Sequence, residues 1–449
     1  MKHAKLGARA RTRGLVAAHA LAMIVAFVSL SLSASPAGAQ IRGLVSGPGQ
    51  TAFPIAIPRL EGPGLGSADS DRFGTILGRD LEISGLFRVV PQASAMTLTG
   101  AGAPEIDYAP WASMGARFVV GGRYERRGPD LVLAAWIYDV GEQRQLGGKR
   151  YEGPPGEAAR MANRFADEVL RLITGERGPF DTEIAFISKR EGGRFKELWV
   201  MRFDGGDLRQ LTRNQSITLS PSWSPDGNSI LYTSYADGRP RLYEMDVANR
   251  RSRRVLAGPG IVVGGRFSPN GREIAVAREE KRGNTDVVLI DRDGRTLGPI
   301  ASDSSIDVSP TWSPDGSQIA FCSSRGGSPQ IYVTGASGGP ARRVTFQGSY
   351  NTSPVWSPRG DKIAYTGRVG RVFQIFVLDL ASGSVTQVTR AGENVDPAWA
   401  PDGRYLVYSS SRSGRDELFV SDWRGLQSHR LIAGPGGDTS PAWSPWLGD

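Results

Sequence analysis

Cysteine is nearly absent from this sequence. The 449 residues include one, Cys322, so a single chain cannot form a disulfide within itself and its core must be held by packing. Cys322 lies in the apolar run IAFCSS, which favours a buried structural thiol over a reactive one. The low cysteine content therefore excludes a disulfide-stapled fold.

Histidine is almost as scarce, with three residues, His3, His19 and His429. A Ser-His-Asp or Cys-His site needs a histidine beside its nucleophile, and His429 lies in a polar stretch far in sequence from Cys322. The sequence shows no G-x-S-x-G elbow, no Cys/His cluster and no EF-hand loop. These absences argue against a hydrolase and against a structural metal site.

Long apolar runs are also missing, except for one near the N-terminus at residues 15–32. Five basic residues precede this run and the small residues AGA follow it, which is the pattern of a secretory signal peptide cleaved between Ala39 and Gln40. A retained membrane anchor is the alternative, but the run is rich in alanine and interrupted by His19 and Ser29. We therefore expect residues 1–39 to be removed and the remainder to be soluble and outside the cytoplasm.

The net charge gives no indication of a nucleic-acid partner. The chain carries a formal charge of +9, but five positive charges belong to the signal segment, and 9 − 5 leaves +4 for the remainder. The arginines are spread through the turns, which is typical of a solvated surface. Binding of nucleic acid is therefore not expected.

What the sequence does contain is a repeat. Phrases related to W-S-P-D-G recur six times, at intervals of 44, 45, 44, 43 and 44 residues. Their aromatic residues are Trp223, Phe267, Trp312, Trp356, Trp399 and Trp443. Short β-prone runs separated by turns follow each complete phrase, for example Ile319–Ser323 and Gln330–Thr334. A period in the forties with four strands predicts a six-bladed β-propeller over residues 181–449. We expect the aromatic residues to pack where blades meet rather than to form a binding ring.

The two ends of this region complement each other. The phrase SPAWSPWLGD at 440–449 has no strands after it, and TEIAFISKREGGRFKELWV at 182–200 matches the second and third strands of a blade with no W-S-P phrase before it. We predict that the last blade takes its first strand from residues 440–449 and its other three from the start of the region. This pairing closes the ring and leaves no free blade edge.

Residues 40–175 have a different pattern and predict a small α/β domain. A strand is expected at 51–60 and a hairpin at 116–140, and a short linker at 175–179 leads to the propeller. Two helices are predicted from apolar faces at Phe73, Ile76, Leu77 and Leu81 and at Met161, Phe165, Val169, Leu172 and Ile173. Gly175 is expected to end the second helix.

The turns and loops indicate which propeller face binds. Asp226, Asp315 and Asp402 stand in Pro-Asp-Gly turns, where Asp bonds its own backbone, so a turn role is favoured over metal binding, with a cation in the propeller channel left open. The loops entering the aromatic strands emerge on the opposite face and differ between the copies. This variation fits recognition of an asymmetric partner, and it also fits simple loop tolerance.

In these motifs the chain resembles the TolB family, the periplasmic propeller proteins of the Tol–Pal envelope system. The resemblance covers the whole chain after the signal segment and rests on PWASMGARFVVGGRYERRG, EVLRLITGERGPFDTEIAFIS, the six repeats and the final SPAWSPWL. It implies a protein that is not an enzyme and has no cofactor, and that associates with the envelope through its partners. We expect it to be a monomer.

The resemblance also implies two partner surfaces. The peptidoglycan-associated lipoprotein Pal binds the propeller face at the channel mouth, and in some bacteria colicins, which are imported proteins, bind the same face. The expected Pal contacts are Leu219, Ser220, Val262, Val263, Asp307, Val308, Ser309, Thr352, Ser353, Val395 and Asp396. The inner-membrane-anchored protein TolA binds the N-terminus left by cleavage, through Gln40, Ile41, Arg42, Leu44 and Val45. The system maintains outer-membrane integrity and draws the envelope inward at cell division.

Two features depart from the family pattern. The second repeat has Phe267 and IVVGG where a polar, histidine-bearing loop is expected, and the N-terminal segment is richer in Gly and Pro. That segment adds as a strand to a partner's sheet or pairs within its own domain. The alternative function is an exported propeller enzyme, either peptidase-like or a lactonase with a channel metal. The scarcity of histidine argues against the peptidase.

Overall fold

The computed structural model describes residues 52–447 except 61, 63–66, 92, 94–95, 99–101, 103–105, 191–192, 256–259, 282, 433 and 435. The predicted cleavage site at Ala39 and the predicted TolA segment lie outside the described residues; that segment comprises Gln40, Ile41, Arg42, Leu44 and Val45. Within the described part, no helix is long and apolar enough to span a bilayer.

The α/β part is built on one five-stranded sheet with the strand order β2-β1-β3-β4-β5. Strand β1 is parallel to β2 and β3, whereas β3, β4 and β5 are antiparallel. The elements are β1 (Phe53–Ala56), α1 (Ser67–Ile83), β2 (Phe87–Val89), α2 (Ala109–Ser113), β3 (Phe118–Arg127), β4 (Asp130–Asp139), β5 (Arg144–Gly153), the 3-10 turn η2 (Pro155–Glu157) and α3 (Ala158–Thr174).

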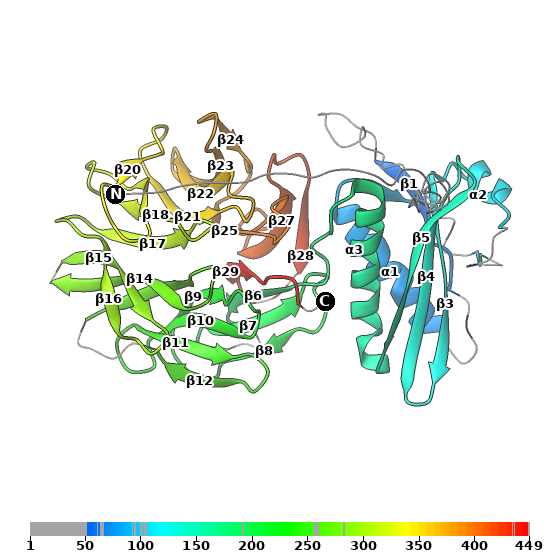
Figure 1. Cartoon of the computed structure of the whole chain (residues 1–449), viewed down its shortest axis with the longest axis horizontal. Helices are drawn as coiled ribbons and strands as arrows, with labels where there is room; N and C mark the ends of the chain where they lie inside the picture. The colour runs from blue at the N-terminus through cyan, green and yellow to red at the C-terminus, as the bar shows by residue number, and fades with distance from the viewer. Residues whose placement is uncertain are drawn as a thin grey trace, which may run out of the picture. The chain divides into compact units, whose positions relative to one another are not determined.

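Helix α3 forms where apolar side chains repeat every three or four residues. Met161, Phe165, Val169 and Ile173 are all buried, and the helix ends at Gly175, whose φ of 81° is readily adopted only by glycine. Helix α1 packs beside it (Figure 1), with the rings of Phe73 and Phe165 6.4 Å apart. Both predicted helices and the predicted glycine stop are confirmed.

Strand β5, with the sequence RQLGGKRYEG, is not predicted by the sequence pattern. Its side chains are exposed or half-buried, so no apolar alternation marks it. It forms because it pairs with β4 along its whole length through backbone hydrogen bonds, from Leu131 opposite Gly153 to Asp139 opposite Arg144. A Cβ at Gly148 would lie 2.3 Å from the Trp136 ring, so glycine is needed there for the strand to pass the indole.

The propeller consists of six antiparallel four-stranded sheets, and the predicted fold class is confirmed. Blade one has β9 (Thr218–Trp223), β10 (Ser229–Ser234), β11 (Arg241–Asp246) and β12 (Arg251–Arg254). Blade two has β13 (Val262–Phe267), β14 (Glu273–Lys281), β15 (Asn284–Asp291) and β16 (Thr296–Ala301). Blade three has β17 (Asp307–Trp312), β18 (Gln318–Ser323), β19 (Gln330–Gly335) and β20 (Arg342–Arg343).

Blades four to six repeat this arrangement. Blade four has β21 (Asn351–Trp356), β22 (Lys362–Val369), β23 (Val372–Asp379) and β24 (Val385–Gln387). Blade five has β25 (Asn394–Trp399), β26 (Tyr405–Ser410), β27 (Glu417–Asp422) and β28 (Ser428–Ile432). Blade six has β29 (Asp438–Trp443), β6 (Glu183–Ser188), β7 (Glu197–Arg202) and β8 (Arg209–Gln210).

The W-S-P-D-G turns are held by local hydrogen bonds. Asp315 Oδ1 accepts the Ser313 hydroxyl at 2.5 Å and the Ser317 N–H at 3.0 Å, and Gly316 has a φ of 73°. These hydrogen bonds to Ser313 and Ser317 lower the pKa of Asp315 to about 2. The same turn recurs at Asp226, and Asp402 likewise accepts the N–H two residues on, so all three carboxylates take the turn role.

The aromatic residues of the repeats join neighbouring blades. The indole N–H of Trp223, Trp312 and Trp399 each donates to a carbonyl of the preceding blade, at Ala442, Arg266 and Val355, over 3.0 to 3.1 Å. All of the aromatic residues except half-buried Trp356 are buried. Each buried ring removes a large apolar surface from water where two blades meet, as expected from the sequence.

The ring is closed by pairing segments from the two ends of the propeller. Strand β29 pairs with β6 from Asp438 opposite Ser188 to Trp443 opposite Ile184, as the red and green strands of Figure 1 show. The Trp443 indole N–H donates to Thr182 Oγ1 at 2.8 Å, and its ring stacks on Phe203 with centroids 5.5 Å apart. The predicted closure of the sixth blade is confirmed.

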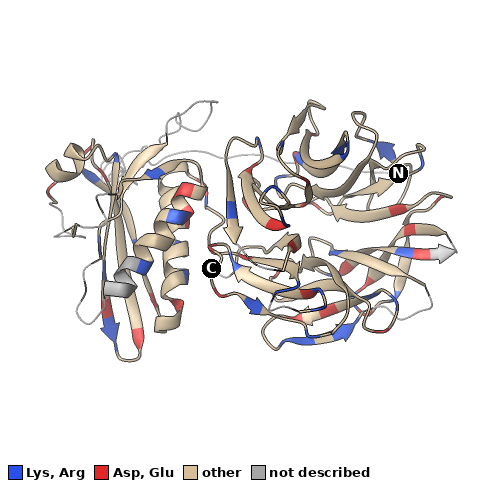
Figure 2. Ribbon diagram, turned by 180° about the vertical axis from the view of Figure 1, so that it is seen from behind, with Lys and Arg blue, Asp and Glu red and all other residues tan. Residues whose placement is uncertain are grey.

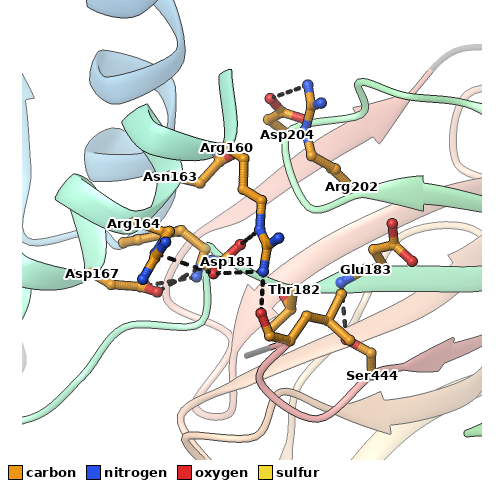
Figure 3. A network of polar contacts seen from close by, with 12 residues as sticks. Arg160, Asn163, Arg164, Asp167, Asp181, Thr182, Glu183, Arg202, Asp204 and Ser444 are labelled. Carbon is orange, nitrogen blue, oxygen red and sulfur yellow. Dashed lines mark hydrogen bonds and ion pairs between the residues drawn. The ribbon is translucent and has the colours of Figure 1, made fainter. Parts of the chain in front are cut away.

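A polar network links α3 to the start and end of the propeller (Figure 3). Arg160 Nε donates to Asp181 Oδ1 at 2.8 Å, and its Nη2 donates to the Leu447 carbonyl. Asp167 of α3 accepts the backbone N–H of Phe180 at 2.8 Å and of Asp181 at 3.2 Å. One carboxylate of the helix therefore fixes the chain just before it enters β6.

Because Asp167 is buried, its pKa is raised from the usual value of 3.8 to about 8, against the lowering effect of these two N–H donors. A raised folded-state pKa means that its contribution to stability is complete below about pH 4 and is lost as the pH rises through about 8. Across this range we expect the free energy of unfolding to fall by up to about 1.4 kcal/mol per pH unit. The thermal midpoint should fall with it. Asparagine cannot ionise, so in Asp167→Asn the thermal midpoint measured by circular dichroism should fall less as the pH rises. If the midpoint of the variant depended on pH as steeply as that of the wild type, Asp167 would not be the group responsible.

Candidate partner-binding face

The inner strand of every blade has the same irregularity near the channel mouth. In each, the strand register shifts at one residue with positive φ, and five of these residues precede proline. The six residues are Ser220, Gly264, Ser309, Ser353, Asp396 and Ser440, with φ between 49° and 64°. With the prolines they line a small chamber of about 90 Å³. The chamber is the upper part of the propeller channel.

The predicted Pal contacts all lie on these inner strands, at different depths. Ser220, Ser309, Ser353 and Asp396 line the chamber. Leu219, Val263, Val308, Thr352 and Val395 are half-buried. The side chains of Val262 and Asp307 are buried, and Asp307 pairs with Arg325 at 2.8 Å, so these two support the mouth from within.

Immediately before the inner strands stand three isoleucines that the sequence reasoning did not select. Ile217, Ile261 and Ile306 are 47%, 40% and 51% exposed. They occupy equivalent positions in their blades. In each blade the isoleucine carbonyl accepts a backbone N–H from the end of the second strand or from the residue just after it. The donors are Tyr235, Glu279 and Ser324, in the same order. A sequence pattern that could have identified them is an isoleucine at the same distance before the aromatic residue in three of the six repeats. We call these three residues the isoleucine arc.

The exposed apolar side chains concentrate on the same face. Because strand two runs antiparallel to strand one, its following turn lies beside the mouth. Of ten exposed large apolar residues in the described part, seven belong to the loops and turns of this face: Phe195, Ile217, Ile261, Ile306, Phe346, Val369 and Val372. The opposite face has Leu208, Leu297 and Leu426. An apolar cluster of this kind is typical of a protein-binding surface.

Charge does not single out another face. Figure 2 shows basic and acidic residues interspersed along both the propeller and the α/β part.

Cys322 is buried, and burial raises the pKa of its thiol to about 11, so the thiol is protonated at neutral pH. Burial also lowers the pKa of His429. Within the described ranges, no three His, Cys, Asp or Glu side chains gather as a possible metal site.

Comparison with known proteins agrees with both parts of the fold. A family model described as the TolB beta propeller domain matches residues 170–447, and one described as the TolB amino-terminal domain matches residues 44–146. The chain belongs to the TolB family. Its members include proteins named as components of the Tol–Pal system.

Individual relatives show how far the similarity extends. The chain is 35% identical over 330 residues to the protein TolB homolog of Chlorobium luteolum, covering 73% of this chain and 74% of that one. It is 40% identical over 295 residues to the Tol-Pal system protein TolB of Anaeromyxobacter dehalogenans, covering 64% and 67%. The crystal structure of TolB from Acinetobacter baumannii is 26% identical and superposes with a TM-score of 0.79, covering 88% of this chain and 97% of that one.

Proposed function

We propose that this protein is a non-enzymatic periplasmic scaffold of the Tol–Pal system. It binds the lipoprotein Pal at the channel mouth of the propeller and TolA through the N-terminus left by signal cleavage. In this role it supports outer-membrane integrity and envelope constriction during division, and it associates with the envelope only through its partners. Membership of the TolB family supports a role in the Tol–Pal system. The geometry of the channel mouth supports its choice as the Pal-binding surface.

The isoleucine arc is the observation that carries the Pal assignment. Three half-exposed β-branched side chains lie on one half of the rim, at blades one, two and three. The equivalent positions on the other half are Tyr350, Glu393 and Gly437. At this position the rim therefore carries isoleucine in blades one to three and no aliphatic side chain in blades four to six, which suits a partner with an asymmetric surface. In blade three, the Arg325–Asp307 ion pair fixes the start of β17 directly after Ile306, so this part of the surface is preorganised.

We expect Ile306→Glu to weaken binding of the soluble domain of this organism's own Pal about tenfold or more, because it places a charge in the apolar part of the proposed contact. Calorimetric titration of the mature protein measures this. Leu297→Glu is the matched control, since Leu297 is equally exposed, at 50%, but lies on the opposite face. Wild-type protein that fails to bind at micromolar concentration would refute the proposal, as would equal losses in the two variants.

The N-terminal assignment is tested separately. Deleting Gln40–Val45 removes the proposed TolA segment without touching any described residue of the propeller. TolA binding should be abolished while Pal binding keeps its wild-type affinity. Pull-down with the isolated TolA domain and titration with Pal distinguish the two outcomes. If the shortened protein still binds TolA, the segment is not the binding site.

A further inference from the structure

One inner strand carries a cation into the propeller channel. The residue before the aromatic position lines the channel in every blade, and in five blades it is small or uncharged: Ser222, Thr311, Val355, Ala398 or Ala442. In blade two it is Arg266. Arg266, Val355 and Pro441 border both the upper chamber and the wider cavity below it. The guanidinium therefore lies at the junction between the two spaces.

Within the described ranges, Arg266 has no ion-pair partner. Its Nη1 donates to the Pro221 carbonyl at 3.1 Å and, more weakly, to the Gly265 carbonyl at 3.5 Å. Among the described residues, Nε and Nη2 have no acceptor and no carboxylate lies within ion-pair distance. Burial lowers the pKa of the guanidinium, but arginine remains charged at neutral pH. The side chain is half-buried in the channel wall, so its charge is only partly hydrated and an anion at Nε and Nη2 would be stabilised.

Asp396 offsets this charge only from a distance. Its Oδ2 accepts the Ser440 hydroxyl at 2.9 Å, and its Oδ1 accepts the Ser353 hydroxyl at 3.3 Å. Both carboxylate oxygens are thus directed toward hydroxyl groups of neighbouring blades. The carboxylate lowers the cost of keeping Arg266 charged without occupying its hydrogen-bond donors.

The lower cavity, which we call the funnel, has an apolar wall. Its volume is about 420 Å³, within the usual range for small-molecule sites. Most of the wall is formed by the six repeat aromatics, Trp446 and the prolines of the W-S-P turns, with serine and threonine side chains between them. All six indole N–H groups of this wall are already donated, five to backbone carbonyls and that of Trp443 to Thr182 Oγ1, so the rings present mainly carbon to the cavity. An apolar wall with one unpaired cation at its inner end matches an amphiphilic anion.

We propose that the funnel binds a monocarboxylate with an apolar body. The carboxylate accepts hydrogen bonds from Nε and Nη2 of Arg266, and the apolar body packs against the tryptophans and prolines. The chamber above is too small, at about 90 Å³, for more than the head group. Both an aliphatic acid and the C-terminal end of a peptide have this chemistry. The funnel lies at the other end of the channel from the isoleucine arc, and its inner end borders the chamber that Asp396 lines.

Titration calorimetry of the full mature chain tests this with N-acetyl-L-phenylalanine and its carboxamide, which lacks the charge. We expect the acid to bind about 10- to 100-fold more tightly than the amide, because the acid alone makes charge-assisted hydrogen bonds with Arg266. Arg266→Met should abolish the difference. Arg371→Met removes the same charge from an exposed turn on the other face and should leave the difference unchanged. Equal affinities for acid and amide, or unchanged acid binding by Arg266→Met, would overturn the proposal.

A second variant has the opposite expected effect, so misfolding cannot imitate it. Asp396→Asn removes the opposing negative charge and should tighten binding of the acid several-fold, more at low salt than at high salt. Weaker binding in Asp396→Asn would also overturn the proposal. Octanoate distinguishes the two sources of ligand. If octanoate binds as tightly as the acetylated amino acid, the site takes aliphatic acids, and if only the amino acid binds, it takes peptide ends.

Discussion

Removing the last ten residues, 440–449, should open the ring and strongly destabilise the propeller. The truncation deletes most of β29, the inner strand of blade six, including buried Ala442 and Trp443. Loss of one buried Trp side chain costs about 3–5 kcal/mol, and the exposed edge of β6 adds to this. We therefore expect destabilisation of more than about 5 kcal/mol and a fall in the thermal midpoint of more than about 10 °C. Thermal unfolding followed by circular dichroism, together with limited proteolysis, measures both.

A shorter truncation provides the control. Removing only residues 448–449 leaves every strand of blade six in place and should not shift the midpoint. If the protein lacking residues 440–449 unfolded like the intact chain, β29 would not be required to hold the ring. The closure of the propeller would then depend on contacts between blades alone.

Asp438→Ala should have the second largest effect. Asp438 accepts hydrogen bonds from Nε of Arg190 at 3.1 Å and from Nη2, and the two side chains are 0% and 8% exposed. The pair joins the start of β29 to the turn after β6. Breaking a buried ion pair by removing one partner costs about 3–5 kcal/mol, because the remaining charge stays buried without compensation. Denaturant unfolding should show a loss of this size.

The repeats supply matched controls for this pair. In blade five Asn394 takes the equivalent place and accepts from Arg412 at 3.1 Å, so Asp438→Asn should retain part of the stability. In blade three Asp307 pairs with Arg325, which is 23% exposed and also contacts Asp303. Asp307→Ala should therefore cost less than Asp438→Ala. Equal costs would show that burial of the arginine does not decide the energy.

The sequence alone determined the features that depend on neighbours in the chain. The W-S-P-D-G turns form through hydrogen bonds over two to five residues, as at Ser313 and Asp315, so their spacing was sufficient to predict six blades and their closure. Helix α3 was predictable for the same reason, since its buried face repeats locally and Gly175 stands at its end. Strand β5 was not, because the ladder offered by β4 rather than its own residues decides its conformation.

The tertiary structure decided what the surface and the channel present. The sequence directed attention to the loops that enter the inner strands. The residues predicted there lie in or under the channel wall, and the exposed isoleucines immediately precede them. Side-chain direction at the mouth depends on the bulge in each inner strand and on the neighbouring blades, neither of which has a local signal. Likewise, the sequence alone does not distinguish the arginine of β13 from the other surface arginines, because its position in the channel depends on closure of the ring. Only then does Arg266 lie inside a channel near Asp396, 130 residues later in the chain, whose carboxylate acts on it.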